Sequence, residues 1–371
     1  MATPLQELSA HRQSPWLDYI SRPFLHDGEM AGLVDDGIVG VTSNPTIFQQ
    51  AIAGGDAYDD QLREVLRDEH DIKEAFLALA RNDIREACDV FAGVFGRSGE
   101  GGAIRDGWVS LEVDPTLAMD AERTVAEAKR LHELIGRPNL LVKIPGTEPG
   151  LRAIEDTIAA GIPVNVTLLF SLERHRAAAE AYLRGLRRLR DSGGDLRAVA
   201  SVASFFVSRV DTEADRRLDE LGGHDDLKGT LAIANAKLAY QTYLELFGER
   251  EEWQELRAAG AEPQRCLWAS TSTKNPAYRD VLYVEELIGP ETVNTMPRET
   301  VEAFQDHGRV EPTLERDVDG AHATLERFAQ AGIDYEDVVA VLEREGVQKF
   351  ADSFQQLLDG VASKRDQLIA A

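Results

Sequence analysis

Short apolar stretches rich in β-branched residues alternate along the chain with longer segments whose hydrophobic residues recur at helical spacing. Eight of these stretches have the length and composition of buried strands. They cover residues 15–20, 37–43, 107–113, 139–145, 162–168, 198–204, 266–270 and 291–296. Strands that alternate with helices predict a parallel sheet, and eight such units in this length favour an α/β fold with a single (β/α)8 TIM barrel. A doubly wound open sheet is the competing fold.

Helical patterns also occur beyond what eight simple repeats require. They predict helical additions at about residues 50–100, 210–264 and 300–371. Neither an internal repeat nor a dividing linker is evident, so we predict one domain over residues 1–371. The C-terminal helices should pack on the barrel, because the last one carries apolar residues at helical spacing. We interpret these residues as a packing stripe against the barrel or a partner subunit: Phe350, Phe354, Leu357, Val361 and Leu368.

Composition excludes several classes of function. The formal net charge of −25 disfavours binding to nucleic acid and to anionic membrane surfaces. No apolar run reaches about 18 residues, and the N-terminus lacks the basic and apolar regions of a signal peptide. The two cysteines, Cys88 and Cys266, are far apart and form no CxxC motif, which fits a cytoplasmic protein without a disulfide framework.

The sequence has neither a nucleotide-binding glycine loop nor a metal-binding histidine motif. The glycine-rich stretch at residues 93–107 precedes a predicted strand, whereas a nucleotide-binding glycine loop follows a strand and opens a helix. We therefore predict a flexible loop there. The histidines show no HExxH or paired-ligand spacing, so we expect no metal site.

Polar side chains recur on one face, near the C-terminal ends of five predicted strands. Alternate residues of a strand face the same side, and the outward face of a barrel strand must be apolar where it meets the helices. The polar face therefore points into the mouth of the barrel, where active sites of this fold lie. Its members are Asp18, Gly40, Thr42, Asn44, Ser110, Glu112, Lys143, Asn165 and Thr167.

Each polar residue taken alone has a structural explanation. Lys143 could form an ion pair with Glu112, and Asn44 could cap a helix that starts at Pro45. Asp18 could be a turn or cap residue, and Asn165 and Thr167 could be satisfied core polar groups. Burying so many polar groups together is costly unless something uses them. Their joint placement therefore favours an active site over a structural polar core.

A buried lysine beside carboxylates points to Schiff-base chemistry. A lysine in a low-dielectric pocket is more easily deprotonated, and its neutral amine can attack a ketone or aldehyde. The resulting protonated imine is an electron sink that permits retro-aldol cleavage, if a carboxylate takes a hydroxyl proton. Asp18 and Glu112 are candidates for this proton transfer and for the dehydration of the carbinolamine. An ionised Glu112 next to Lys143 would instead favour the ammonium form, so their separation matters.

Three motifs resemble signature regions of the transaldolase family. They are "GVTSNPTIF" (40–48), "SLEVDPTLAMD" (110–120) and "LLVKIPGTEPGLRAIEDTIAAGIPVNVTLLFS" (140–171), and the resemblance extends over about residues 15 to 300. It implies a (β/α)8 barrel that needs neither a metal nor an organic cofactor. It also implies transfer of a dihydroxyacetone unit from sedoheptulose 7-phosphate to glyceraldehyde 3-phosphate, which gives erythrose 4-phosphate and fructose 6-phosphate.

The resemblance assigns roles residue by residue. Lys143 matches the Schiff-base lysine and Asp18 the acid/base for carbon–carbon cleavage. Glu112 matches a glutamate that acts through a water molecule, and Thr167 a residue that helps to hold that water. The remaining residues match positions at the substrate. Asn44 and Asn165 match asparagines that bind the dihydroxyacetone hydroxyls, Ser204 and Arg209 match phosphate-binding positions, and Phe206 matches an aromatic residue that lines the site.

The sequence departs from the family pattern at "ASTSTKN" (269–275), where better-known members carry a phosphate-binding arginine after a shorter run. Lys274 is the candidate replacement. The chain is also longer than the common form and resembles a long-form subgroup, which leaves a monomer or a homodimer open. Two alternatives to a transaldolase acting on sugar-phosphate substrates remain: a class I aldolase that releases free dihydroxyacetone, and a non-catalytic sugar-phosphate-binding barrel.

Overall fold

Eight parallel strands close into a barrel in the computed structural model, which describes residues 2–67, 69–97 and 105–370. Neighbouring strands follow chain order, and β1 closes the barrel by pairing with β8. This arrangement confirms the predicted (β/α)8 fold and rules out the open sheet. The strands are β1 (Gln13–Leu17), β2 (Gly40–Val41), β3 (Trp108–Glu112), β4 (Leu140–Pro145), β5 (Val164–Leu169), β6 (Ser201–Phe206), β7 (Gln264–Ala269) and β8 (Thr292–Met296).

The strand boundaries differ from the predicted ones by a few residues. Asp18 follows β1 instead of lying within it, although its amide still donates to the Met296 carbonyl oxygen at 2.8 Å. Residues 196–198 form a 3-10 turn, so β6 starts at Ser201 and extends to Phe206. The apolar pattern locates a strand, but the ladder ends where the chain bends away from its neighbour.

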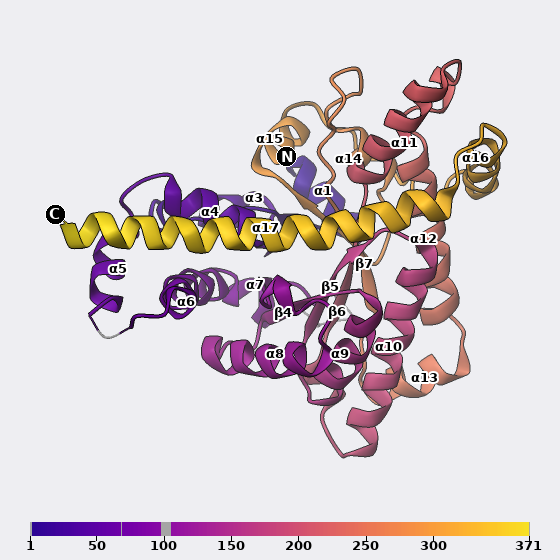
Figure 1. Ribbon diagram of the computed structural model, residues 1–371. Helices are drawn as coiled ribbons and strands as arrows, with labels where there is room; N and C mark the ends of the chain where they lie inside the picture. Colours follow the sequence, from indigo (N-terminus) through magenta and orange to yellow (C-terminus); the bar gives the residue numbers. More distant parts are fainter. Residues whose placement is uncertain (1, 68, 98–104, 371) are drawn as a thin grey trace.

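Helices follow the strands and also fill the predicted additions (Figure 1). They are α1 (Pro4–Ala10), α2 (Arg22–His26), α3 (Glu29–Asp36), α4 (Pro45–Ala53), α5 (Asp59–Val65), α6 (Ile72–Val90), α7 (Ala92–Arg97), α8 (Ala121–Ile135), α9 (Glu148–Ala159), α10 (Leu172–Asp191), α11 (Ser208–Leu221), α12 (Leu231–Phe247), α13 (Glu251–Ala258), α14 (Leu282–Glu286), α15 (Arg298–His307), α16 (Val318–Gln330) and α17 (Tyr335–Ala370). The prediction that the whole chain is one domain stays a prediction. Residues 98–104 of the glycine-rich stretch lie outside the described residues. The prediction of a flexible loop is wrong for residues 93–97, which belong to α7.

Polar caps start the helices that follow the site strands. The Thr147 hydroxyl accepts a hydrogen bond from the Gly150 amide at 3.1 Å at the start of α9, and Ser171 accepts one from Arg174 at the start of α10. Each cap satisfies an amide that has no partner within its helix. Because these caps come directly after β4 and β5, they fix where the two strands end at the barrel mouth.

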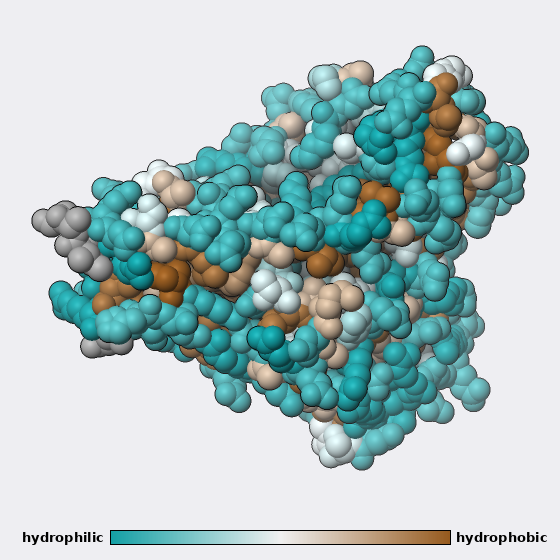
Figure 2. Space-filling view, viewed as in Figure 1, coloured by the Kyte–Doolittle hydropathy of each residue, from teal (hydrophilic) through white to brown (hydrophobic). Residues whose placement is uncertain are grey.

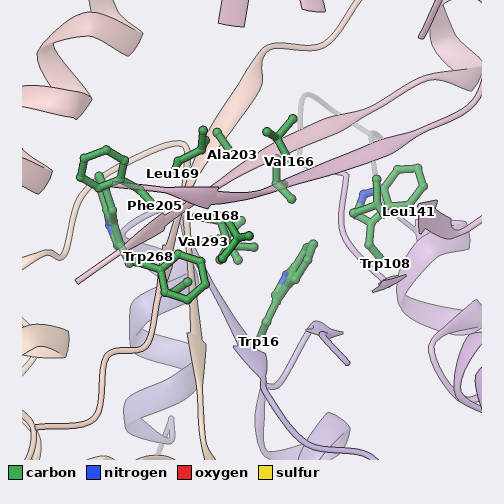
Figure 3. Close-up of a cluster of buried hydrophobic side chains, with 14 of the residues drawn as sticks. Trp16, Trp108, Leu141, Val166, Leu168, Leu169, Ala203, Phe205, Trp268 and Val293 are labelled. Atoms are coloured by element: carbon green, nitrogen blue, oxygen red, sulfur yellow. The ribbon is translucent and has the colours of Figure 1, made fainter. Parts of the chain in front are cut away.

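Large apolar side chains fill the space in and around the barrel (Figure 3). Trp16 of β1 is fully buried and lies against Gly40 of β2. A Cβ atom at Gly40 would come within 2.6 Å of the Trp16 indole, so only glycine allows the ring to lie there. This packing supports the layer of polar residues that lies above it at the C-terminal ends of the strands.

The C-terminal helix α17 is the longest element of the chain, with 36 residues. It crosses one face of the molecule, from beside α11 and α16 to beyond α5 (Figure 1), and contacts α4, α6 and β5. The predicted stripe is buried at Phe350, Phe354, Leu357 and Val361, so it packs within the chain. Figure 2 shows a mainly hydrophilic face, with apolar side chains gathered beside α17. None of the described helices is both long and apolar enough to cross a membrane.

Candidate active site

Lys143 lies in the centre of the barrel mouth on β4. It is 5% exposed and stands in register between Glu112 of β3 and Asn165 of β5. Its Nζ donates a hydrogen bond to the Ser43 carbonyl oxygen at 3.2 Å and lies 3.5 Å from Glu112 Oε2. The ion pair considered from the sequence therefore exists, in a position open to the mouth of the barrel.

Glu112 is a buried carboxyl group with few partners. Burial raises its pKa to about 7, although the Lys143 charge opposes this shift. Both of its carboxylate oxygens, and the buried hydroxyl of Thr167, lack a hydrogen-bond partner among the described residues. A carboxyl group with a pKa near neutrality can both give and take a proton at the pH of the cell.

Asp18 is the second carboxyl group at the mouth. It accepts a 2.6 Å hydrogen bond from the Thr42 hydroxyl, which also shares a 2.8 Å hydrogen bond with Thr295. Burial raises the pKa of Asp18, and the charges of Lys143 and Arg209 oppose this rise. Asp18, just after β1, and Glu112, at the end of β3, are each close enough to Lys143 to interact with its charge.

The two asparagines differ in their surroundings. Asn165 is fully buried, donates to the Ser110 hydroxyl at 3.0 Å and accepts from the Ser204 hydroxyl at 2.7 Å. Asn44 caps α4 by accepting a 3.0 Å hydrogen bond from the Ile47 amide. The capping role considered from the sequence is therefore real, and Asn44 faces the barrel mouth as well.

A cavity of about 220 Å³ opens above Lys143. Eight of the ten residues that were predicted to have a catalytic or substrate-binding role line it: Asp18, Asn44, Lys143, Thr167, Ser204, Phe206, Arg209 and Lys274. Glu112 and Asn165 are not part of this lining, but each contacts a residue that is: Glu112 pairs with Lys143, and Asn165 accepts a hydrogen bond from Ser204. The alternation rule accounts for Asp18, Asn44, Lys143 and Thr167 in this lining, and the family resemblance supplied the other four residues.

Cationic side chains lie on one side of this cavity. The Arg209 guanidinium lies 4.9 Å from the centre of the Phe206 ring and 5.8 Å from that of Phe350. Burial lowers the pKa of Arg209, and none of the described carboxylates forms an ion pair with it. Lys274 follows β7 as predicted, and its Nζ donates to the Ser272 hydroxyl at 2.7 Å.

Two cavity residues come from α17 and were missed. Lys349 and Phe350 line the cavity, whereas the sequence pattern assigned Phe350 to packing alone. Its ring is buried and lies 5.9 Å from Lys143 Nζ. The sequence offers one weak signal for these residues, a lysine at position 349 beside the apolar stripe. Such a lysine is common on any amphipathic helix, so it does not indicate a binding site. No cluster of three metal-ligating side chains occurs in the described part of the chain.

The comparisons with known proteins agree with this architecture. Residues 15–361 match the family described as "Transaldolase/Fructose-6-phosphate aldolase". The chain is 52% identical to a protein named transaldolase from Frankia alni, with 98% of each chain covered. It is 51% identical to one from Parafrankia sp. over the full length of both, and 49% identical to one from Thiobacillus denitrificans over 95% of this chain and 98% of that one. Together with the lysine-centred barrel mouth, this similarity shows that the chain belongs to the transaldolase/fructose-6-phosphate aldolase family.

Proposed function

We propose that this protein is a transaldolase, in which Lys143 forms a Schiff base with a ketose phosphate. The reaction moves a dihydroxyacetone unit from sedoheptulose 7-phosphate to glyceraldehyde 3-phosphate and gives erythrose 4-phosphate and fructose 6-phosphate. The observation that carries the proposal is the buried Lys143–Glu112 pair, 3.5 Å apart at the mouth of the barrel. The family and the relatives named transaldolase support it.

The pair offers a route to a neutral amine. If a proton passes from the Lys143 ammonium to the Glu112 carboxylate, both groups become neutral, which low-dielectric surroundings favour. The amine then attacks the ketone carbon and forms a carbinolamine. Loss of its hydroxyl as water requires a proton, which protonated Glu112 supplies directly or through a water held by Thr167. The product is an iminium on Lys143.

Asp18 is suited to the cleavage step. Its carboxylate takes the proton from the C4 hydroxyl of the bound ketose, the C3–C4 bond breaks, and an aldehyde leaves. The bonding electrons move into the iminium and form an enamine. When the enamine carbon attacks the acceptor aldehyde, Asp18 returns the proton to the new hydroxyl. Hydrolysis of the iminium then releases the product ketose and restores Lys143.

The remaining residues bind the substrate in this proposal. Asn44 and Asn165 hydrogen-bond hydroxyls of the dihydroxyacetone unit, and Asn165 is held for this by Ser110 and Ser204. Arg209 offers a planar fork for two phosphate oxygens, and Lys274 adds a point charge. The buried, separate cysteines support a reducing compartment, so we place the reaction in the cytoplasm.

Borohydride trapping tests the Schiff base. Reduction in the presence of fructose 6-phosphate should inactivate the protein and leave one dihydroxyacetone-derived adduct on Lys143. Lys143→Met should give no adduct, whereas Lys129→Met, at an exposed lysine of α8, should be labelled like the parent protein. An adduct on another lysine, or none at all, would refute the mechanism.

A two-substrate assay separates the alternatives. Turnover that requires both fructose 6-phosphate and erythrose 4-phosphate identifies a transferase. Release of free dihydroxyacetone from the ketose alone identifies a class I aldolase, the other activity in the family's description. The difference lies in how well the closed site keeps water away from the enamine. Absence of both activities would leave a non-catalytic sugar-phosphate-binding barrel.

A further inference from the structure

The helix α17 reaches the barrel mouth through a close packing contact. Gly346 is buried, and a Cβ atom placed on it would lie 3.1 Å from the Leu168 side chain and 3.3 Å from Phe170. Leu168 itself has a positive φ of 62°, at the irregular end of β5. Four residues further along the helix, the ring of the buried Phe350 lies 5.9 Å from Lys143 Nζ and 5.8 Å from the Arg209 guanidinium. These two anchors, on one helix face, fix the position of the residues between them.

Lys349 lies between these anchors and faces the substrate cavity. It lines the cavity above Lys143 and also an adjoining, outer cavity of about 590 Å³. Arg209 and Lys274 line both cavities too, so the three cations stand where the two cavities meet. The Arg209 charge, burial and the Lys274 charge lower the pKa of Lys349, in that order. The three cations therefore repel one another.

The described carboxylates offset this cluster only in part, since the charges of Asp18 and Glu112 act on Arg209 without an ion pair. None of the three cations forms an ion pair within the described part of the chain. Of the carboxylates that line the outer cavity, Glu213 is bound to Arg216 and Arg217 at 2.7 Å each, and Glu345 is exposed to solvent. Three unpaired cations in a chain with a net charge of −25 form a local positive potential that favours a dianion.

We propose that Lys349 is a third phosphate-binding residue and that α17 is thereby part of the substrate site. It would contact the phosphate monoester at the end of the sugar chain that lies farthest from Lys143. Arg209 is held by two aromatic rings, whereas Lys349 and Lys274 are flexible point charges that can follow a phosphate between the two cavities. The identity of the ligand as a sugar phosphate rests on the proposed function; the anion site does not.

Direct binding of inorganic phosphate tests this site without turnover. Calorimetric titration of Lys349→Met should show a dissociation constant about three- to ten-fold above that of the parent protein, as expected for one charged contact at an exposed site. Lys349→Arg should bind phosphate with a dissociation constant close to that of the parent protein. Arg344→Met is the matched control, since Arg344 is an exposed cation of the same helix that lines neither cavity. Lys349 is exposed and makes no ion pair in the described chain, so these substitutions do not threaten folding.

Kinetics add an independent readout. Lys349→Met should raise the KM for glyceraldehyde 3-phosphate by a similar factor and leave the KM for unphosphorylated glyceraldehyde almost unchanged. Equal phosphate affinities of Lys349→Met and Arg344→Met, or no phosphate binding by the parent protein, would overturn the inference. A protein that binds phosphate through Lys349 but forms no adduct on Lys143 would refute the proposed function and leave the anion site standing.

Discussion

Glu112→Gln tests whether the raised pKa of a buried carboxyl group serves imine formation. The pKa of Glu112 is about 7 against an ordinary value of 4.5. The difference of about 2.5 pKa units corresponds to about 3 kcal/mol. At pH 7, about half of the Glu112 population is therefore protonated, whereas an ordinary glutamate would be protonated in about one molecule in 300. Burial thus supplies a proton donor that an exposed side chain would lack.

Glutamine keeps the shape of the side chain but has no acidic proton that it could donate near neutral pH. Imine formation should slow by about 10²- to 10⁴-fold, the usual contribution of a general acid/base group. In the parent protein, the dehydration-limited rate at saturating ketose should fall as the pH rises through about 7, because the acid form of Glu112 disappears. The substitution should remove this pH dependence.

The assay is the rate of borohydride-trapped adduct on Lys143, followed by mass spectrometry over a pH series. Glu127→Gln is a matched control, since Glu127 is also 8% exposed and ion-paired, to Lys73 and Arg130, but lies away from the cavity. A pH dependence that persists in Glu112→Gln, or an equal loss of rate in the control, would refute the reasoning.

Three further substitutions test other parts of the structure. Asp18→Asn should lower turnover by about 10²- to 10⁴-fold while the trapped ketose adduct accumulates; a loss of turnover without accumulation would argue against its role in cleavage. Phe350→Ala should lower the free energy of unfolding in urea by about 3 kcal/mol, and a change below about 1 kcal/mol would show that the ring packs loosely. Burial raises the pKa of Asp211 from 3.8 to about 7. The folded state therefore binds the carboxyl proton more tightly than the unfolded state, and the free energy of unfolding falls as the pH rises from about 4 through 7. Asp211→Asn should make the free energy of unfolding, measured in urea at several pH values, fall less over this range. The same fall in the variant as in the parent protein would show that Asp211 does not cause it.

The sequence alone determined the barrel and most of its mouth. Strand periodicity separates an apolar outer face from a polar inner one, and parallel strands bring all their C-terminal ends to one side. Lys143, Glu112 and Asn165 were therefore predicted to face the same barrel mouth, and the register pairs Lys143 with each of the other two. Local rules suffice here because strand neighbours are fixed by chain order and by hydrogen bonding.

Only the tertiary structure decided what covers that mouth. Periodicity predicted that the final helix has an apolar face, and the buried Phe354, Leu357 and Val361 agree. It placed that face against the barrel or a partner subunit, but it did not predict which part of the barrel the face would meet, because any apolar groove of the right width can bury it. The contact of Gly346 with Leu168 selects the site end of β5 and so brings Lys349 and Phe350 to the cavity. The pKa of Glu112 likewise depends on burial by residues distant in sequence, since desolvation is a property of the packed fold and not of the strand that carries the carboxyl group.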